Sequence, residues 1–339
     1  MPTMNDVARV AEVSIATVSH VINGTRFVSP ERVERVQAAM RELDYTPDAN
    51  ARSLRVGRTE TIGLVIPDNT NPFFAELARW IEDAGFEAGY TTILGNSNER
   101  PDRERRYIAT LFSKRIDGLI ITATARSDDA ALTASLHKAR IPIVLMDREM
   151  DLPMADVVLY DDAAGSGEVA RHLLELGHTR FACVAEPSGV PAERVEGFRQ
   201  ALRERGVTLD GDAVVPGDFH FAGGREATAR LLSTGTPFTA LFAANDLMAA
   251  GAIRELSAHD LSVPHDVSVV GFDDAPIAEM VSPPLTTVRQ PLRDMAEVAV
   301  SLLLARLSGR ADAKRARRVL ATSLVVRDST APPARAERQ

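Results

Sequence analysis

The feature that most constrains this chain is a regular alternation, beginning near Thr59, of short apolar runs and longer amphipathic stretches. An apolar run of about four to eight residues is typical of a buried strand, whereas apolar residues every three or four positions indicate a helix. Strands that alternate with helices form parallel sheets with helices on both faces. We therefore expect an α/β body after residue 59.

The alternation runs through the body twice. In the first half, strands are predicted at 62–68, 91–96, 118–122, 143–147 and 157–161, with helices near 73–88, 102–115, 129–140 and 163–177. In the second half, strands are predicted at 181–185, 213–218, 240–245 and 267–273, with helices near 191–206, 222–234 and 246–258. Two half-domains of about five strands each fit a chain of 339 residues. Later strands at 286–290 and 319–326, with a helix near 292–308, are expected to cross back and link the halves.

Residues 4–59 have a different pattern, that of short helices. The run Asn5–Ala11 has helical spacing, and Ser14 is a typical N-cap for a second helix over Ile15–Ile22. Two short helices joined by so few residues form a helix-turn-helix, whose second helix enters the major groove of DNA by its N-terminus. This segment predicts a DNA-binding headpiece.

A third helix is predicted to begin at Pro30, after Ser29 as its cap. Its apolar stripe can close a small core over the first two helices, and it consists of Val33, Val36, Met40 and Leu43. The part of the second helix outside this core carries Ile15, Ala16, Ser19 and His20. Ile15 and Ala16 could contact thymine methyl groups, and His20 could bond a base edge or phosphate. An ordinary three-helix domain would share this pattern.

The next segment supports the DNA-binding interpretation. Pro47 and Gly57 bracket a helical run of about nine residues, below the roughly 12 to 15 that an isolated helix needs in water. Leu54 lies among arginines at 52, 55 and 58. An apolar tip with basic flanks suits the minor groove, where leucine can wedge into a base step. An interdomain linker is the alternative.

The charge distribution fits a DNA-binding protein only in part. The whole chain has a net charge of -8; residues 1–59 hold 8 Lys+Arg and 7 Asp+Glu, so the remainder is acidic. No apolar run approaches the roughly 20 residues of a membrane span, and no signal segment is evident at the N-terminus. We expect a cytoplasmic protein with no membrane partner. Cys183, the sole cysteine, lies in a strand-like run and is expected to be buried.

Polar residues follow most of the predicted strands in the body. In doubly wound sheets, ligands bind beyond the carboxyl ends of the strands. The strand-ending pairs and residues are Asp68-Asn69, Asn96, Asp147-Arg148, Asp161-Asp162, Asn245-Asp246 and Asp273-Asp274. Aromatic residues Phe73, Phe74, Phe219 and Phe221 follow two of the strands. Carboxylates and amides beside aromatic faces suit sugar rings or nucleobases.

Helix capping is the competing explanation for these polar residues. We favour capping for Asp162 and Asp246, which begin predicted helices, and ligand binding for Asp147-Arg148 and Asp273, which precede loops. An enzyme is disfavoured because the chain lacks a Gly-x-Ser-x-Gly elbow, a phosphate-binding Gly-x-x-x-x-Gly-Lys loop and a Gly-x-Gly-x-x-Gly fingerprint. Its seven histidines show no metal-ligand spacing. We expect no catalytic residue, metal or cofactor.

Met4–Ala8, Val18–Ser29 and Pro47–Arg55 together resemble the headpiece and hinge of the lactose-repressor (LacI/GalR) family, most of all its purine-repressor branch. The rest of the chain resembles the family's two-lobed effector domain, which is similar to periplasmic sugar-binding proteins. The resemblance implies an all-α helix-turn-helix headpiece plus an α/β domain with two doubly wound parallel sheets. It also implies a homodimeric, sequence-specific repressor of operator DNA, controlled by a small molecule bound between the lobes.

Matching the family motifs residue by residue implies base contacts from Ile15, Ala16 and His20, and minor-groove insertion by Leu54. The full set of predicted DNA-binding residues is Ile15, Ala16, Thr17, Ser19, His20, Arg26, Ala51, Leu54 and Arg55. The resemblance also implies a stacking Phe73 and a bidentate clamp from Arg194. The predicted effector-binding residues are Asn69, Phe73, Phe74, Asp147, Arg148, Arg194, Phe219, Phe221, Asn245 and Asp273.

The resemblance favours a carbohydrate effector, because the purine-binding branch has an aromatic residue where Arg148 stands. A nucleobase or nucleoside is the alternative. The expected domains are the headpiece (1–46), a hinge helix and linker (47–59), the effector-binding and dimerisation domain (60–328) and a flexible tail (329–339). Within the effector domain, lobe 1 is expected at about 60–161 and 291–318, and lobe 2 at about 162–290 and 319–328. The tail carries no leucine heptads, so nothing predicts assembly beyond a dimer.

Overall fold

The structure of the protein is a computed structural model that describes residues 2–24, 26–46, 58–124, 130–188, 190, 192–312 and 314–334. The chain divides into two compact units, Met1–Glu60 and Thr61–Gln339. Within the described residues, no helix combines the length and the apolar character needed to cross a membrane.

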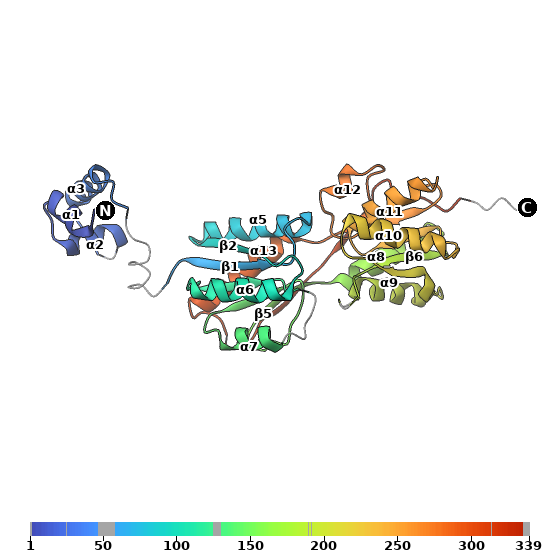
Figure 1. Cartoon of the computed structure of the whole chain (residues 1–339), viewed down its shortest axis with the longest axis horizontal. Helices are drawn as coiled ribbons and strands as arrows, with labels where there is room; N and C mark the ends of the chain where they lie inside the picture. The colour runs from blue at the N-terminus through green and yellow to red at the C-terminus, as the bar shows by residue number, and fades with distance from the viewer. Residues whose placement is uncertain are drawn as a thin grey trace, which may run out of the picture. The chain divides into compact units, whose positions relative to one another are not determined.

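The first unit contains three helices, α1 (Met4–Val10), α2 (Ile15–Asn23) and α3 (Pro30–Glu42) (Figure 1). A capping box between Thr3 and Asp6 begins α1, and the Ser14 side chain accepts a hydrogen bond from the Thr17 N–H to begin α2. The buried core that holds the three helices together consists of Val7, Ala8, Ala11, Val18, Val36 and Ala39. The three predicted helices are therefore confirmed.

One half of the second unit, here called lobe 1, is built on a parallel sheet of six strands. Their order across the sheet is β11-β5-β4-β3-β1-β2. The strands are β1 (Thr61–Ile66), β2 (Thr91–Asn96), β3 (Gly118–Ile121), β4 (Ile143–Met146), β5 (Asp156–Tyr160) and β11 (Arg317–Leu320). The order places β2 at one edge of the sheet.

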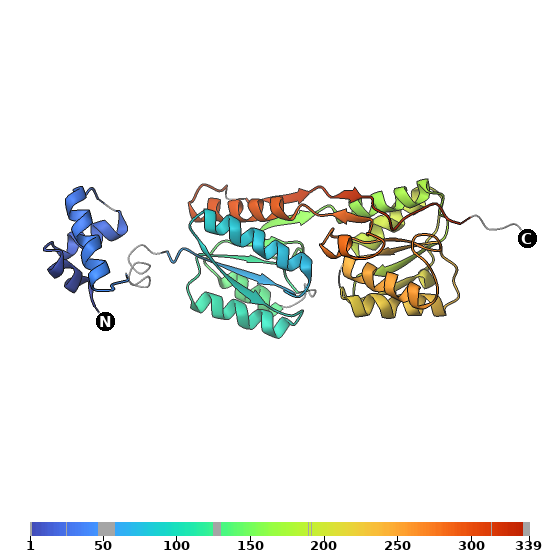
Figure 2. The same cartoon turned by 90° about the horizontal axis from the view of Figure 1, so that it is seen from above.

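Helices cover both faces of this sheet because successive strand residues point to opposite sides. Along β1, Leu64 enters a core shared with α5 (Pro72–Glu87) and α13 (Leu292–Leu307), and Val65 enters the core on the other face. That second face is covered by α6 (Pro101–Ser113) and α7 (Ala130–Lys138). Figure 2 shows α5 and α13 along the same side of lobe 1.

The other half, lobe 2, has a parallel sheet of four strands in the order β7-β6-β8-β9. The strands are β6 (Phe181–Ala185), β7 (Val214–Pro216), β8 (Ala240–Ala243) and β9 (Ser268–Val270). The helices on one face are α8 (Asp162–Glu175) and α9 (Glu193–Glu204), and those on the other are α10 (Phe221–Ser233) and α11 (Asp246–Ala258). Short helices η1 (Gly211–Ala213) and α12 (Ile277–Met280) complete the lobe.

The chain crosses between the lobes three times: after β5, between β10 (Thr287–Arg289) and α13, and between β11 and β12 (Ser323–Val325) (Figure 2). The predicted single strand 319–326 is wrong, because Leu320 pairs with Tyr160 in lobe 1 whereas β12 pairs antiparallel with β10. The crossing therefore divides one apolar run between two sheets. The sheets hold six and four strands, where about five each were expected.

The segment from residue 329, expected to be a flexible tail, begins tied to lobe 2. Ser329 is fully buried, and its hydroxyl donates to the Val269 carbonyl (2.6 Å). The Ala331 N–H donates to Ser268 Oγ (3.0 Å), and the His178 ring contacts the Ala331 carbonyl (2.9 Å). Polar side chains of lobe 2 thus hold the backbone of the segment at least as far as Ala331.

Candidate functional site

The N-terminal part of α2 presents small apolar groups on the surface of the first unit. The side chain of Ile15 is half exposed and Ala16 is exposed, while Val18 on the opposite face is fully buried in the core of the unit. Ser14 caps the helix and leaves its first turn directed outward. This is the surface that a recognition helix needs.

Polar side chains farther along α2 are partly engaged within the helix. The hydroxyl of Thr17 lies 2.9 Å from Ser14 Oγ, and the Asn23 amide donates to the Ser19 carbonyl (2.6 Å). His20 is partly buried, and Arg26, beyond the end of the helix, is exposed. The predicted contacts from Ala51, Leu54 and Arg55 lie outside the described residues.

Phe27 is an exposed residue that the sequence analysis did not single out. Its side chain is 88% exposed, in the connection between α2 and α3. A single exposed apolar side chain does not by itself define a contact surface, so Phe27 is not assigned to the DNA-binding set.

The second unit contains a pocket of about 390 Å³ between the two lobes. Its wall comes from the carboxyl ends of strands in both sheets and from the loops that follow them. Eight of the ten predicted effector residues line it: Phe73, Phe74, Asp147, Arg148, Arg194, Phe219, Asn245 and Asp273. The volume is within the usual range for a small-molecule site, roughly 300–1,000 Å³.

Arg194, at the start of α9, is held in the pocket by three partners. Its Nε donates to Asp162 Oδ2 (2.9 Å), and its Nη1 donates to Asp273 Oδ1 (3.1 Å) and to the Ala244 carbonyl (2.6 Å). The guanidinium carbon also lies 4.1 Å from the centroid of the Phe272 ring. These contacts fix the plane of the guanidinium, which a bidentate contact to a ligand requires.

Burial changes the charge balance around Arg194. Desolvation raises the pKa of Asp273 to about 7 despite the opposing effect of Arg194, and burial likewise raises the pKa of Asp147 and Glu186. Burial lowers the pKa of Arg194, but Asp162, Asp273 and Asp147 outweigh it, so the guanidinium stays charged. Within the pocket, carboxylates thus surround the Arg194 guanidinium, which remains a cation.

The backbone is strained at three of the pocket residues. Asp147, Phe219 and Asp273 have φ angles of 62°, 66° and 111°, which non-glycine residues rarely adopt. Such conformations persist where surrounding contacts hold them, and they concentrate at binding sites. Here they turn each side chain toward the pocket at the end of its strand.

Arg148 closes the lobe 1 side of the pocket. Its Nη1 donates to the Ala123 carbonyl (3.0 Å), and its Nη2 lies 3.4 Å from Glu99 Oε1. The guanidinium carbon lies 5.9 Å from the centroid of the Phe219 ring, which belongs to lobe 2. Arg148 therefore reaches from one lobe toward the other beside the ligand space.

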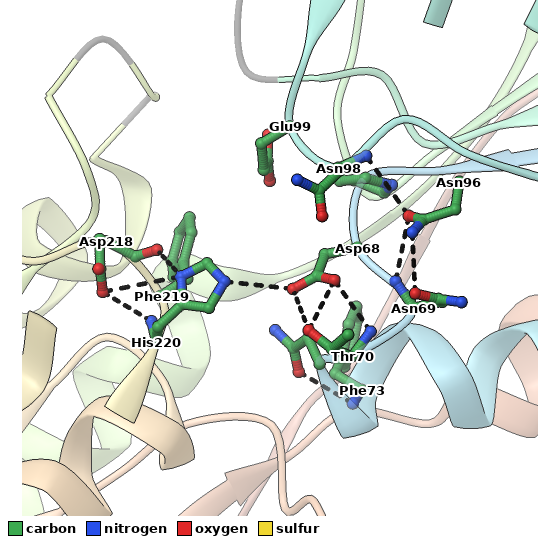
Figure 3. Close-up of polar contacts among 12 residues, drawn as sticks. Asp68, Asn69, Thr70, Phe73, Asn96, Asn98, Glu99, Asp218, Phe219 and His220 are labelled. Carbon is green, nitrogen blue, oxygen red and sulfur yellow. Dashed lines mark hydrogen bonds and ion pairs between the residues drawn. The ribbon is translucent and has the colours of Figure 1, made fainter. Parts of the chain in front are cut away.

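Two predicted residues lie away from the pocket wall. Asn69 pairs with Asn96 through a hydrogen bond from Asn96 Nδ2 to Asn69 Oδ1 (2.8 Å), as Figure 3 shows. Phe221 begins α10, is 42% exposed and does not line the pocket. The residue two positions after Asn69, Asn71, lines the pocket instead and caps α5 through the Phe73 N–H.

The roles expected for capping and ligand binding are partly exchanged. Asp161, not Asp162, caps α8 by accepting from the Ala164 N–H (3.0 Å), and Asp162 lines the pocket. Asn245 caps α11, because its Oδ1 accepts a hydrogen bond from the Met248 N–H. Its amide nitrogen donates to the Phe219 carbonyl (3.0 Å). The Asn245 side chain is therefore committed to the scaffold, and it positions Phe219.

Asp246, also expected to be a cap, has a different structural role. It is fully buried and accepts from the Ala275 N–H (2.8 Å) and the Thr287 hydroxyl (2.5 Å), which ties α11 to β10.

Two further pocket residues were not predicted from the sequence. Tyr160 ends β5, and its buried hydroxyl has no partner among the described residues. Glu186 follows β6; its Oε1 accepts from the Arg194 N–H (2.8 Å), and its Oε2 has no partner there. Both lie at the ends of strands. The rule that ligands bind beyond the carboxyl ends of strands, which predicted Asp147, could therefore also have predicted Tyr160 and Glu186. Both residues line the pocket.

A helix-turn-helix unit followed by a two-lobed domain with a polar pocket defines a ligand-responsive DNA-binding protein. Residues 3–48 match the model of bacterial regulatory proteins of the lacI family, and residues 170–330 match a periplasmic binding protein-like domain. The chain is 40% identical over 310 residues to the ribose operon repressor of Escherichia coli (strain K12), covering 91% of this chain and 94% of the relative. It is 38% identical over 310 residues to the transcriptional repressor PurR of Aliivibrio salmonicida, covering 91% and 92%.

Solved structures agree with this assignment. A lac repressor dimer bound to operator and an anti-inducer is 30% identical with a TM-score of 0.87, covering 97% of this chain and 99% of that one. A regulator from Enterococcus faecium with bound ribose is 35% identical with a TM-score of 0.72, covering 80% and 99%. The chain belongs to the LacI family of transcriptional regulators. It is a DNA-binding regulator controlled by a small molecule, and the predicted fold class is confirmed.

Proposed function

We propose that this regulator is a repressor released from or held on its operator by a neutral sugar of pentose size, with D-ribose the first candidate. The observation that carries the proposal is the arrangement of Asp147, Asp162 and Asp273 around the Arg194 guanidinium in the pocket. Carboxylates accept hydrogen bonds from the hydroxyl groups of a sugar. The fixed guanidinium of Arg194 donates hydrogen bonds to the hydroxyl oxygens of the sugar. The rings of Phe73 and Phe219 offer apolar faces to the sugar carbons.

The charge of the pocket wall bears on the kind of sugar. Seven carboxylate side chains line the pocket (Asp147, Glu149, Asp161, Asp162, Glu186, Glu193 and Asp273), against three arginines (Arg148, Arg194 and Arg317). The excess of acidic over basic side chains along this wall disfavours a sugar phosphate or sugar acid, because like charges repel in a partly desolvated site. A neutral polyol supplies the hydroxyl donors that these acceptors need.

The relatives of this chain support a sugar as effector and leave a nucleobase as the alternative. The relative from Escherichia coli is named a ribose operon repressor, and the solved regulator from Enterococcus faecium holds ribose. The PurR relative, together with three phenylalanines in the pocket, favours a nucleobase as the second candidate. A nucleobase needs donors and acceptors in one plane, which Arg148, already bonded to Ala123 and Glu99, offers poorly.

We further propose that α2 contacts operator bases through Ile15, Ala16 and His20, and that residues 47–59 form a hinge whose Leu54 enters the minor groove. In a homodimer, two hinges would meet at the operator centre, and a change in the angle between lobes would separate them. A coupling of roughly 1 to 3 kcal/mol is usual for such allostery. We propose no catalytic activity, and we place the regulator in the cytoplasm, where it meets chromosomal DNA.

Thermal unfolding of the full-length protein tests the effector assignment. The panel is D-ribose, D-xylose, ribose 5-phosphate, hypoxanthine and guanine; a ligand that binds only the folded state raises the Tm with its concentration. We expect D-ribose or another neutral sugar to raise the Tm and ribose 5-phosphate to leave it unchanged. A shift with a nucleobase alone contradicts the sugar proposal.

Operator binding then links the effector to regulation. A duplex selected from random sequence serves as operator, and its affinity is measured with and without the effector. Arg194→Lys, which keeps the charge and loses the bidentate geometry, should retain operator binding and lose at least about tenfold in effector affinity. The control is Arg225→Ala, since Arg225 pairs with Glu255 outside the pocket. Equal effector affinity in the two variants would remove Arg194 from the site.

A further inference from the structure

A buried glutamine outside the pocket is hydrogen-bonded to the pocket wall. Gln290 lies in the crossing between β10 and α13 (Figure 2), and it is buried without lining the pocket. Its Nε2 donates to Asp162 Oδ1 (3.1 Å). The other oxygen of the same carboxylate, Oδ2, accepts from Arg194 Nε (2.9 Å). One carboxylate therefore connects the Arg194 guanidinium in the pocket to a segment that joins the lobes.

The carboxylate that makes this connection lies where the crossings of the chain meet. Asp162 begins α8 directly after the crossing that leaves β5, and Gln290 directly precedes Pro291, the cap of α13. The Asp161 carbonyl accepts from the Thr322 hydroxyl of the third crossing (3.1 Å). The three crossings are thus hydrogen-bonded to one another at residues 161 and 162, beside the pocket.

Stability alone does not account for a glutamine at position 290. The Gln290 Oε1 is buried and has no hydrogen-bond partner among the described residues. A buried acceptor without a partner costs free energy, so a methionine of similar length and shape would avoid that cost. What methionine lacks is the N–H that reaches Asp162. The bond to Asp162 is therefore the interaction that a glutamine adds here.

The position of Gln290 makes this bond sensitive to the angle between the lobes. A change in that angle is taken up by backbone torsions in the crossings. Since Gln290 lies in a crossing and Asp162 in lobe 2, the distance between their side chains changes with the angle. A hydrogen bond of 3.1 Å tolerates little such change. The Asp162 carboxylate, and with it Arg194, is therefore held differently when the lobes stand at another angle.

We propose that Gln290 is a positioning residue that couples the effector pocket to the angle between the lobes, acting through Asp162 on Arg194. The inference rests on the proposed function, because it needs an effector that Arg194 binds. An effector shifts the equilibrium between two lobe angles only by as much as it binds one of them better. The bond from Gln290 makes the orientation of Arg194 differ between the two angles, and so contributes to that difference in affinity.

The test measures how far D-ribose changes the operator affinity of the full-length protein. Fluorescence anisotropy of a duplex selected from random sequence gives the operator Kd without and with saturating D-ribose, and calorimetry gives the Kd of D-ribose. Gln290→Met removes the donor at nearly constant side-chain length. Gln200→Met is the matched control, since it makes the same change in α9, where Gln200 donates to Glu204 (3.0 Å) outside the pocket.

The response to D-ribose is the ratio of the two operator Kd values. We expect a response of roughly 5-fold to 150-fold in wild type and in Gln200→Met. In Gln290→Met, with D-ribose still bound at saturation, the response should shrink by about tenfold or disappear, the size of a hydrogen bond to a charged group. A mere loss of stability would lower the Tm without changing this ratio. A response within about twofold of wild type overturns the proposal and leaves the sugar assignment intact.

A second measurement needs no effector. In protein containing isotopically labelled arginine, the NMR signal of the Arg194 Nε–H is identified by its absence in Arg194→Lys. Exchange of this proton with water is slow while Asp162 accepts it in a fixed orientation. We expect several-fold faster exchange in Gln290→Met, and wild-type exchange in Gln200→Met. Equal exchange in all three proteins overturns the proposal, whereas failure of D-ribose to bind overturns only the proposed function.

Discussion

Asp273 and Asp274 are neighbours in sequence, yet their charges have opposite effects on stability. Asp273 is buried in the pocket among other carboxylates, and its desolvation raises its pKa to about 7. Asp274 accepts from Arg289 Nε (2.6 Å) and Arg327 Nη2 (2.6 Å), so two guanidiniums balance its charge. The first carboxylate costs free energy when it ionises, and the second is compensated.

The stability of the ligand-free protein should therefore fall with rising pH. Between about pH 4 and 7, folded Asp273 keeps a proton that the unfolded chain releases, so the free energy of unfolding decreases over this window. Asp273→Asn should flatten the pH dependence and raise the Tm at pH 8 by several degrees, as each unit of pKa shift is worth about 1.4 kcal/mol. Asp274→Asn should lower the Tm at every pH. Calorimetric melting of both variants from pH 5 to 8.5 tests these expectations. If the Tm of Asp273→Asn falls with pH as steeply as that of the wild type, the raised pKa does not belong to Asp273.

The same residues show what a sequence can reveal about a site. Strand ends could be located because the strands are apolar runs, and this placed Asp147 and Asp273 correctly beside the pocket. Which member of a polar pair faces the ligand depends on the backbone torsion at the strand end, which no spacing rule contains. Asn71 lines the pocket where Asn69 was expected, and Asp162 lines it where a helix cap was expected, as consequences of that geometry.

Among the elements, the start of α2 depends on one side chain. Ser14 and Ser29 precede α2 and α3, but only the Ser14 hydroxyl accepts a hydrogen bond from its helix, at the Thr17 N–H (3.1 Å). Sequence alone could not separate the two serines, since both precede helices and both are preferred N-caps.

Ser14→Ala should therefore cost about 1 kcal/mol of stability in the first unit, and Ser29→Ala markedly less. The loss also loosens the first turn of α2, so operator affinity should fall more for Ser14→Ala than for Ser29→Ala. Hydrogen exchange of the amides of 15–18 and titration of a selected duplex measure the two effects. Equal losses in both variants would falsify the capping assignment.

In the molecule as a whole, the chain crosses between the lobes in segments that can be recognised in the sequence only as apolar runs. Residues 317–325 hold β11 and β12, which belong to different sheets, and the turn between them is fixed by the Thr322 hydroxyl donating to the Asp161 carbonyl (3.1 Å). The division of this run between two sheets depends on the strands with which β11 and β12 pair, which lie far away in the sequence. Periodicity identifies strands but cannot say which sheet each one joins.

The edge of the lobe 1 sheet is the surface on which we expect two copies to meet. β2 lies at the edge and exposes Ile93 and Leu94, with Phe86 of α5 and Tyr107 of α6 also exposed. Adjacent elements thus present four large apolar side chains, and a stable interface of this kind buries about 1,200–2,000 Å² in total. A repressor that reads two half-sites needs two headpieces, so loss of this interface should also weaken operator binding.

Leu94→Asp should therefore convert the protein to monomers of 36.7 kDa at micromolar concentration, because a charge at the centre of an apolar interface is left without a partner. The variant should stay folded, since Leu94 is 45% exposed within its own chain. Met154→Asp is the control, being 47% exposed in the connection between β4 and β5. Sedimentation equilibrium measures the mass, and duplex titration measures the accompanying loss of operator affinity. A dimer that persists in Leu94→Asp, with operator affinity unchanged, would move the interface to another face of the protein.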